Sequence, residues 1–276
     1  MLVFPNCKIN LGLRIINKRA DGYHDIETIF YPIPLKDAFE IIQSGNTNPV
    51  QFSSSGLGIS GDPADNLCTR AYQLLKKDFP KLPSVKIHLH KTIPMGAGLG
   101  GGSADAAFTL QLLNNQFQLN LSTSQLSGYA VQLGSDCPFF ILNQPCVGNG
   151  RGEILEKISL DLSGYQLLLI NPGIHVNTGE AFSGLKIQGV NSHPVSLPEI
   201  VNQPIQCWPD SLKNDFEKAV FEKFPGIKEI KDTLYKTGAS YAAMSGSGST
   251  VYGLFKKSFS PAINFAPDYF VRLFSL

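Results

Sequence analysis

The sequence predicts an α+β fold, because strand-like and helix-like segments are intermingled along the chain. Segments rich in β-branched and apolar residues, typical of strands, occur from the beginning to the end of the sequence. Segments with apolar residues at helical spacing lie between them. The first two strands are separated only by a short turn, which indicates a hairpin or a pair of near neighbours. This mixture favours α+β over a doubly wound parallel sheet.

Strands are predicted where apolar residues are continuous or alternate with polar ones. Asp21-Gly22 marks the turn after the first strand, since glycine adopts a positive φ at little cost. The segment at residues 85–90 alternates Val, Ile and Leu with Lys and His, as a half-buried strand does. The predicted strands are residues 2–16, 26–33, 39–43, 50–53, 85–90, 138–142, 165–170, 242–244 and 250–255.

Helices are predicted where apolar residues recur every three or four positions. Asp65 or Asn66 is a suitable cap for the first helix. The predicted helices are residues 66–79, 104–117, 124–133, 212–224 and 227–236. A polar, glycine-rich break at residues 148–152 predicts a boundary between an N-terminal domain, residues 1–150, and a C-terminal domain, residues 151–276.

Composition limits the kinds of partner. The 276 residues carry a formal net charge of +1 with scattered lysines, so we expect no nucleic-acid partner. No run reaches the ~18 apolar residues that a membrane span needs, and the first residues lack the pattern of a signal peptide. The five cysteines are widely spaced, which predicts neither a disulfide framework nor a metal site. We therefore expect a reduced, cytoplasmic protein.

The most informative segment is the glycine-rich run at residues 94–103. Five glycines occur among the seven residues from Gly96 to Gly102, after a predicted strand and before a predicted helix that begins at about Ser103. Glycines let the backbone turn its N–H groups toward one point, and the N-terminus of the helix adds free N–H groups and a positive dipole end. The segment therefore predicts a phosphate-binding site.

Two familiar phosphate-binding patterns fit this run only in part. Gly96, Gly98 and Gly101 satisfy G-x-G-x-x-G, but the acidic residue expected ~20 positions later in a dinucleotide-binding unit is absent. Gly102 stands where a P-loop has its lysine. A glycine-rich turn without a ligand is the remaining alternative, and it is disfavoured because so many glycines weaken folding unless the backbone must approach something closely.

Three other segments carry candidate residues whose roles stay open when each is taken alone. Lys8 and Asn10 share one face of the first strand, where Lys8 is either functional or an ordinary surface lysine. Asp136 precedes an apolar run and is either a cap or a buried acid with a partner. The Ser-Gly-Ser-Gly-Ser-Thr run at residues 245–250 is either an anion-binding loop or a hairpin turn.

The order of these segments resembles the GHMP kinase superfamily. That resemblance implies an α+β fold of two domains, the first like domain 2 of ribosomal protein S5 and the second ferredoxin-like. It also implies ATP as co-substrate, a small-molecule substrate and an expected Mg²⁺. The implied ATP-binding residues are Pro94, Met95, Gly96, Ala97, Gly98, Leu99, Gly100, Gly101, Gly102, Ser103, Ala104 and Ser247.

The resemblance also implies roles for residues outside the glycine-rich run. Asp136 would face the substrate hydroxyl, and Lys8 would pair with Asp136 and steady the γ-phosphate. The turn at residues 19–24 resembles that of a member whose substrate is a cytidine diphosphate sugar alcohol. Tyr23, His24 and Phe182 would then hold the cytosine. The implied substrate-binding residues are Asn10, Tyr23, His24, Thr178 and Phe182.

Three alternatives remain at this point. The first is another GHMP kinase, of the homoserine or mevalonate type. The second is a nucleotide-binding regulator without catalysis, which the presence of both Lys8 and Asp136 disfavours. The third is a dinucleotide-binding oxidoreductase.

Overall fold

The computed structural model describes residues 1–45, 47–184, 195–259, 261 and 264–276. The chain forms two compact units, and neither unit is one continuous stretch. The first unit comprises Met1–Lys8, Leu35–Met95 and Gly100–Gln144. The second comprises Ile9–Pro34, Gly96–Leu99 and Pro145–Leu276. The boundary that the sequence predicts at residues 148–152 stays a prediction.

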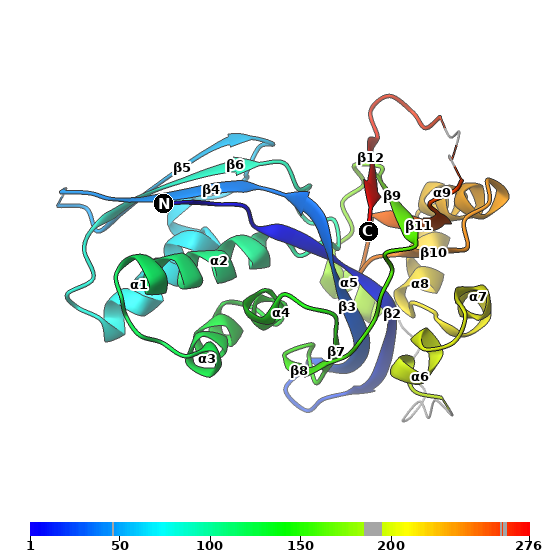
Figure 1. Cartoon of the computed structure of the whole chain (residues 1–276), viewed down its shortest axis with the longest axis horizontal. Coiled ribbons are helices and arrows are strands. Elements are labelled where there is room, and N and C mark those ends of the chain that lie inside the picture. The colour runs from blue at the N-terminus through cyan, green and yellow to red at the C-terminus, as the bar shows by residue number, and fades with distance from the viewer. Residues whose placement is uncertain (46, 185–194, 260, 262–263) are drawn as a thin grey trace. The chain divides into compact units, whose positions relative to one another are not determined.

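The first unit is a four-stranded sheet with helices on one face (Figure 1). The strand order is β1 (Leu2–Val3), β4 (Ala38–Gln43), β6 (Val85–Lys91), β5 (Val50–Gly56). β4 and β6 are antiparallel, and β5 and β6 are parallel. The helical elements are η1 (Pro63–Asp65), α1 (Leu67–Asp78), α2 (Gly101–Gln116), α3 (Thr123–Leu133) and α4 (Cys137–Leu142). These elements confirm the predicted strands at 39–43, 50–53 and 85–90 and the first three predicted helices.

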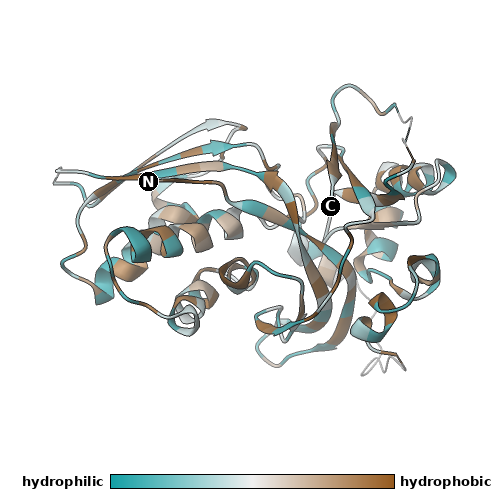
Figure 2. Cartoon of the chain, in the orientation of Figure 1, coloured by the Kyte–Doolittle hydropathy of each residue, from teal (hydrophilic) through white to brown (hydrophobic). Residues whose placement is uncertain are grey.

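The predicted strand at residues 138–142 is wrong, because these residues form α4. Every residue from Cys137 to Ile141 is buried, so the run shows no polar face from which a helical period could be read. Figure 2 shows α4 as continuously hydrophobic, whereas hydrophobic and hydrophilic residues alternate along α1. Pro138 in the first turn is compatible with a helix start, since that position needs no N–H donor.

The second unit contains two sheets, and the first residues of β2 and the last of β3 belong to the first unit. The first has the order β2 (Asn6–Lys18), β3 (His24–Lys36), β7 (Cys146–Asn149), β8 (Ile154–Lys157). The second is antiparallel, in the order β10 (Tyr241–Met244), β11 (Val251–Lys256), β9 (Tyr165–Asn171), β12 (Phe270–Ser275). The helical elements are α5 (Thr178–Ser183), α6 (Leu197–Val201), η2 (Ile205–Cys207), α7 (Trp208–Ser211), α8 (Phe216–Lys223) and α9 (Pro225–Lys236).

The core of the second unit lies between α8, α9 and the antiparallel sheet. Val220, Ile230 and Leu234 are buried in one cluster with Ile170 and Val251. Each fully buried aliphatic side chain contributes about 1.5–3 kcal/mol. No helix of the part of the chain described here is long and apolar enough to cross a membrane.

The predicted helix at residues 212–224 begins too early. Leu212 is extended, Asn214 forms an isolated bridge with Leu13, and α8 starts at Phe216. Asn214 accepts a hydrogen bond from the backbone N–H of Phe216. Side chains of this kind compete with helical backbone bonds, so the helix starts after the asparagine rather than before it.

A buried charged cluster joins the sheet of the first unit to α2. The Lys91 ammonium donates to Asp37 Oδ2 at 2.5 Å and to Asp105 Oδ2 at 2.7 Å. Asp37 Oδ1 also accepts from the backbone N–H groups of Thr92 and Ile93. The cluster therefore fixes the chain where β6 ends, directly before the glycine-rich segment.

Asp105 is incompletely satisfied in this cluster. Its Oδ1 atom is buried and has no hydrogen-bond partner among the described residues. Burial, opposed by the charge of Lys91, raises the pKa of Asp105 to about 7. The two carboxylates outweigh burial at Lys91 and raise the pKa of its ammonium. The folded protein therefore holds a proton on Asp105 that the unfolded chain releases at lower pH.

Asp105→Asn removes this titration. The ordinary pKa of an aspartate carboxyl is 3.8, and the pKa of Asp105 in the folded protein is about 7. The wild type should therefore lose stability relative to D105N as pH rises between about 4 and about 7, by at most about 1.4 kcal/mol per pH unit. Urea unfolding of both proteins across this range measures the difference. A difference that does not change with pH contradicts the prediction.

Candidate active site

The first unit brings the two predicted catalytic residues together. Lys8 Nζ lies 3.4 Å from Asp136 Oδ2. The Lys8 side chain is only 4% exposed and that of Asp136 is 32% exposed, so the pair combines a buried cation with an accessible carboxylate. Asp136 occupies the N-cap position of α4, yet its side chain makes no capping hydrogen bond. Asp136 thus has the charged partner of the second interpretation, although it is not buried, and its role stays a prediction.

The start of α2 lies against Lys8. Gly100 precedes the helix with φ +68°, and a Cβ there would lie 3.1 Å from Lys8 Cε and from the Phe140 ring. Among the described residues no side chain caps α2, so the first N–H groups keep their donor capacity. The helix begins at Gly101, two residues earlier than the predicted start at Ser103. The combination of free N–H groups, helix dipole and Lys8 ammonium suits an anion.

Gly101 and Gly102 differ in how much room each has for a side chain. A Cβ at Gly101 would lie 2.9 Å from Ile93 Cγ2 and 3.0 Å from Lys91 Nζ. A Cβ at Gly102 would meet only Leu67 Cδ1, at 3.8 Å. Gly101 is therefore required by internal packing, whereas a side chain at Gly102 would make only an ordinary van der Waals contact with a described residue. Ser103 and Ala104 complete the first turn, with Ala104 fully buried.

A cavity of about 350 Å³ lies beside this turn in the first unit. Met95 and Gly102 of the glycine-rich segment line it, and Pro94 precedes Met95 in the chain. Its wall also includes Ile59, Pro63, Asn66 and Asp105. Its size and mixed apolar and polar lining are those of a small-molecule site.

In the second unit, residues 245–250 hold the other half of the glycine-rich segment. Ser245 Oγ donates to Gly98 O at 2.8 Å and accepts from the backbone N–H of Asn10. Thr250 N donates to Ala97 O at 3.3 Å. Leu99 is buried, and Gly96 lies against His175. Among the predicted residues, Ala97, Gly98 and Asn10 are therefore brought together.

Other polar residues that were predicted to bind a ligand lie in the same unit. Ser247 Oγ and Thr178 Oγ1 are 2.9 Å apart and share a hydrogen bond. Asn10 is buried, and its Nδ2 donates to Thr28 Oγ1 at 2.9 Å. Thr178 is the first residue of α5, and this helix also contains Phe182.

The predicted aromatic residues form two separate contacts. The rings of His24 and Phe182 stack directly, with centroids 4.5 Å apart and 10° between their planes. Partial burial, followed by the nearby charge of Lys18, lowers the pKa of His24 and favours the neutral imidazole. Tyr23 is 55% exposed, and the Arg151 guanidinium lies 5.0 Å from its ring centroid.

Sequence reasoning missed several residues that support this site. Lys91 could have been found, since the strict alternation along β6 places a lysine on the buried face of the strand. Asp37, Asp105, Asn214 and Glu217 gave no local signal, because their partners are distant in the sequence.

Gly98 should not tolerate a side chain. A Cβ there would lie 2.0 Å from Ser245 O, and φ is +76°. Gly98→Ala should therefore lower the free energy of unfolding by roughly 2–4 kcal/mol, from strain and overpacking. Gly102→Ala, in the same segment, is the matched control and should change it by less than about 1 kcal/mol. Equal unfolding free energies for the two variants would contradict the packing described here.

Comparison with known proteins places the chain in a family. The profile named GHMP kinases N terminal domain matches residues 66–144, and the one named GHMP kinases C terminal matches residues 196–268. These matches confirm the resemblance and the two-domain α+β fold that it implies.

Curated relatives match over nearly the whole chain. A protein of Bacteroides fragilis named 4-diphosphocytidyl-2-C-methyl-D-erythritol kinase is 53% identical over 92% of this chain and 92% of its own length. A protein of Azobacteroides pseudotrichonymphae with the same name is 50% identical over 98% of this chain and 100% of its own.

Solved structures agree. A crystal structure of 4-(cytidine 5'-diphospho)-2C-methyl-D-erythritol kinase matches with a TM-score of 0.78 and 30% identity, covering 92% of this chain and 90% of that one. A homoserine kinase of Cytophaga hutchinsonii matches with a TM-score of 0.69 and 16% identity, over 99% of this chain and 95% of that one, which shows the shared fold alone. The chain therefore belongs to the GHMP kinases, ATP-dependent kinases of small molecules, and within them to the 4-diphosphocytidyl-2-C-methyl-D-erythritol kinases.

Proposed function

We propose that the protein transfers the γ-phosphoryl group of ATP to the 2-hydroxyl of 4-diphosphocytidyl-2-C-methyl-D-erythritol. The products are the 2-phosphate and ADP, and the reaction belongs to the methylerythritol phosphate route to isopentenyl diphosphate. A relative of this name matches at 53% identity over 92% of the chain. The observation in the structure that carries the proposal is the ion pair of Lys8 and Asp136 beside the uncapped start of α2.

Asp136 is the residue assigned to the substrate hydroxyl. Its carboxylate is accessible and lies 3.4 Å from the Lys8 ammonium, so an oxygen that can accept the hydroxyl proton is held in place. As the hydroxyl oxygen forms its bond to the γ-phosphorus, the bond from that phosphorus to the β–γ bridging oxygen breaks and the hydroxyl proton passes to Asp136. Lys8 holds Asp136 in place and offsets negative charge on the transferred group.

The glycine-rich segment is assigned to the nucleotide. N–H groups at the start of α2 and around Gly98 and Gly102 would bind the phosphates, and Ser247 would add a hydroxyl. The cavity lined by Met95 and Asn66 is of suitable size for the nucleoside part. Phosphoryl transfer depends mainly on positioning and charge neutralisation, which these groups supply.

Mg²⁺ fits the donor set of this site. The described residues contain no group of three or more His, Cys, Asp or Glu side chains that could hold a metal alone. Mg²⁺ commonly keeps water and is held through phosphates and one or two protein oxygens. The Ser103 hydroxyl in the first turn of α2 is the protein donor that we assign. The ion would neutralise charge on the phosphates.

The cytosine is assigned to the aromatic residues of the second unit. Stacking on aromatic rings and arginine planes, with hydrogen bonds to base edges, is how proteins hold isolated bases. Tyr23 with Arg151, and His24 with Phe182, offer both kinds of surface. Because neutral imidazole has one donor and one acceptor nitrogen, His24 could also bind a base edge. Asn10 and Thr178 are assigned further contacts to the substrate.

A reduced, cytoplasmic location is part of the proposal. The five cysteines of the chain are all free, and four of them are buried. Burial raises the pKa of the Cys137 and Cys146 thiols to about 12, which keeps them unreactive. Free thiols persist in reducing compartments.

Asp136→Asn should lower kcat about 10²–10⁴-fold, because the amide cannot accept the hydroxyl proton. ADP should still bind, since the phosphate-binding N–H groups do not depend on this carboxylate. Steady-state kinetics and calorimetric titration with ADP measure the two effects. The control is Asp78→Asn, which makes the same charge change at an exposed carboxylate that accepts a hydrogen bond from the Tyr129 hydroxyl. Full activity in D136N would remove Asp136 from the mechanism.

The substrate is tested by comparing acceptors in an ADP-release assay. 4-Diphosphocytidyl-2-C-methyl-D-erythritol should give a kcat/KM at least about a hundredfold above that of homoserine or mevalonate, because neither offers a base for stacking. Comparable turnover of an acceptor without cytidine would contradict the proposed substrate.

A further inference from the structure

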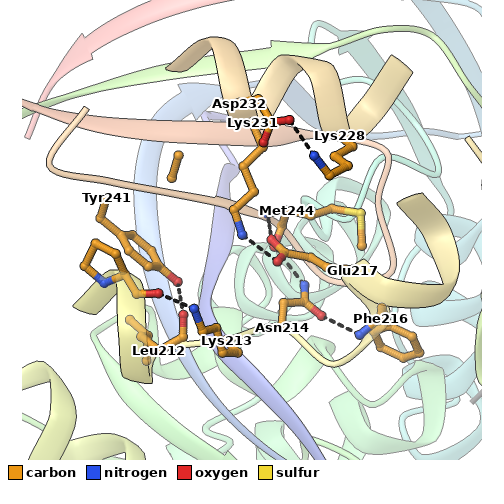
Figure 3. Close-up of polar contacts among 12 residues, drawn as sticks. Leu212, Lys213, Asn214, Phe216, Glu217, Lys228, Lys231, Asp232, Tyr241 and Met244 are labelled. Atoms are coloured by element: carbon orange, nitrogen blue, oxygen red, sulfur yellow. Dashed lines mark hydrogen bonds and ion pairs between the residues drawn. The ribbon is translucent and has the colours of Figure 1, made fainter. Parts of the chain in front are cut away.

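The backbone of residues 245–250 is held by a side chain outside the segments singled out in the sequence. Asn214 lies directly before α8 and is buried. Its Nδ2 donates to Met244 O and to Gly246 O, each at 2.8 Å, and its Oδ1 accepts from the backbone N–H of Phe216 at 3.0 Å. Figure 3 shows the Asn214 side chain among Met244, Glu217 and Phe216. Both hydrogens of the amide are therefore used at the start of this loop.

Glu217 holds the same strand end from the first turn of α8. Its Oε1 accepts from the backbone N–H of Met244 at 2.9 Å, and its Oε2 accepts from Lys231 Nζ at 2.6 Å (Figure 3). β10 is an edge strand that pairs with β11. Asn214 and Glu217 thus bind the N–H and C=O of Met244 as a neighbouring strand would.

Gly246 lies directly against the backbone of the glycine-rich segment. Gly246 has φ +56°, and a Cβ there would lie 3.2 Å from Gly98 Cα. The preceding residue, Ser245, donates to Gly98 O. A backbone shift at Gly246 would therefore move the contacts of Gly98.

We propose that Asn214, supported by Glu217, is a positioning residue for nucleotide binding that fixes Gly246 and, through it, Gly98. This inference rests on the proposed function, in which the N–H groups around Gly98 bind phosphate. Asn214 itself touches no reacting atom. Its effect comes from the two hydrogen bonds that hold the loop backbone, because well-placed N–H donors bind an anion without reorganisation.

A purely structural role for Asn214 makes a different prediction, and Tyr235 provides the matched control. The Tyr235 hydroxyl donates to Ala242 O at 3.1 Å, so it also binds a carbonyl of β10, two residues before Met244. Tyr235→Phe removes that bond without touching Gly246. If Asn214 only tied α8 to β10, N214A and Y235F would affect nucleotide binding alike.

The experiment compares wild type, N214A, N214S and Y235F by calorimetric titration with MgADP and by urea unfolding. N214A should weaken MgADP binding about tenfold, which corresponds to about 1.4 kcal/mol. Y235F should bind MgADP as the wild type does, although its stability falls. In N214A the KM for ATP should rise about as much as the Kd, while the KM for the diphosphocytidyl substrate should change by less than about twofold.

Glu217 gives a second readout. Glu217→Gln keeps an oxygen for the N–H of Met244 and should bind MgADP nearly as the wild type does, whereas Glu217→Ala should bind it more weakly. If N214A does not fold, N214S, which keeps a hydroxyl donor, should still show weaker binding than Y235F.

The outcomes separate this inference from the proposed function. MgADP binding by N214A or N214S within about twofold of wild type, at a stability matching Y235F, would overturn the positioning role while leaving the kinase proposal intact. A wild type that binds no MgADP would overturn the proposed function and this inference with it.

Discussion

Close packing against the backbone of the glycine-rich segment is the constraint on which the rest of the site depends. In the second unit, Gly98 leaves no room for a side chain beside the carbonyl of Ser245. In the first unit, Gly100 and Gly101 leave none beside Lys8 and Ile93. Because internal contacts fix these glycines, the N–H groups of the segment are already held in place before a phosphate arrives. Gly102, which is exposed and lines the cavity, is where a ligand can approach the backbone of α2.

Electrostatics within the first unit follow from that packing. Gly100 allows the stem of Lys8 to lie against the start of α2, and Lys8 in turn pairs with Asp136. A cation, free N–H groups and a helix dipole all favour an anion at this place. The carboxylate of Asp136 is the opposing charge, and its partial exposure leaves it able to meet a hydroxyl group.

A second buried charge cluster serves the fold rather than the chemistry. Lys91 pairs with both Asp37 and Asp105, and Asp37 binds the chain where β6 ends. Removing Lys91 would leave the buried Asp37 carboxylate uncompensated, which is strongly destabilising. The glycine-rich segment is thus anchored by this cluster at its first residues. In the second unit, residues 245–250 hold the segment through Ser245 and Thr250.

Local sequence patterns predicted most of the fold and the chief candidates of the site. Alternation identified β6, helical spacing and Asn66 identified α1, and the glycine run with Lys8 and Asp136 indicated the family. The errors have physical causes. α4 is buried on all sides and so lacks a readable period, and Asn214 delays the start of α8 through a side-chain bond to Phe216. The roles of Asp105, Asn214 and Glu217 depend on partners far away in the sequence, which no local pattern reveals.

In the proposed reaction a phosphoryl group passes from ATP to one hydroxyl of an intact cytidine diphosphate compound. Phosphorus NMR of the reaction mixture tests it most directly. A new phosphomonoester signal should appear together with ADP, while the diphosphate signals of the acceptor persist. Release of inorganic phosphate without a phosphomonoester, or cleavage of the acceptor's diphosphate, would contradict it.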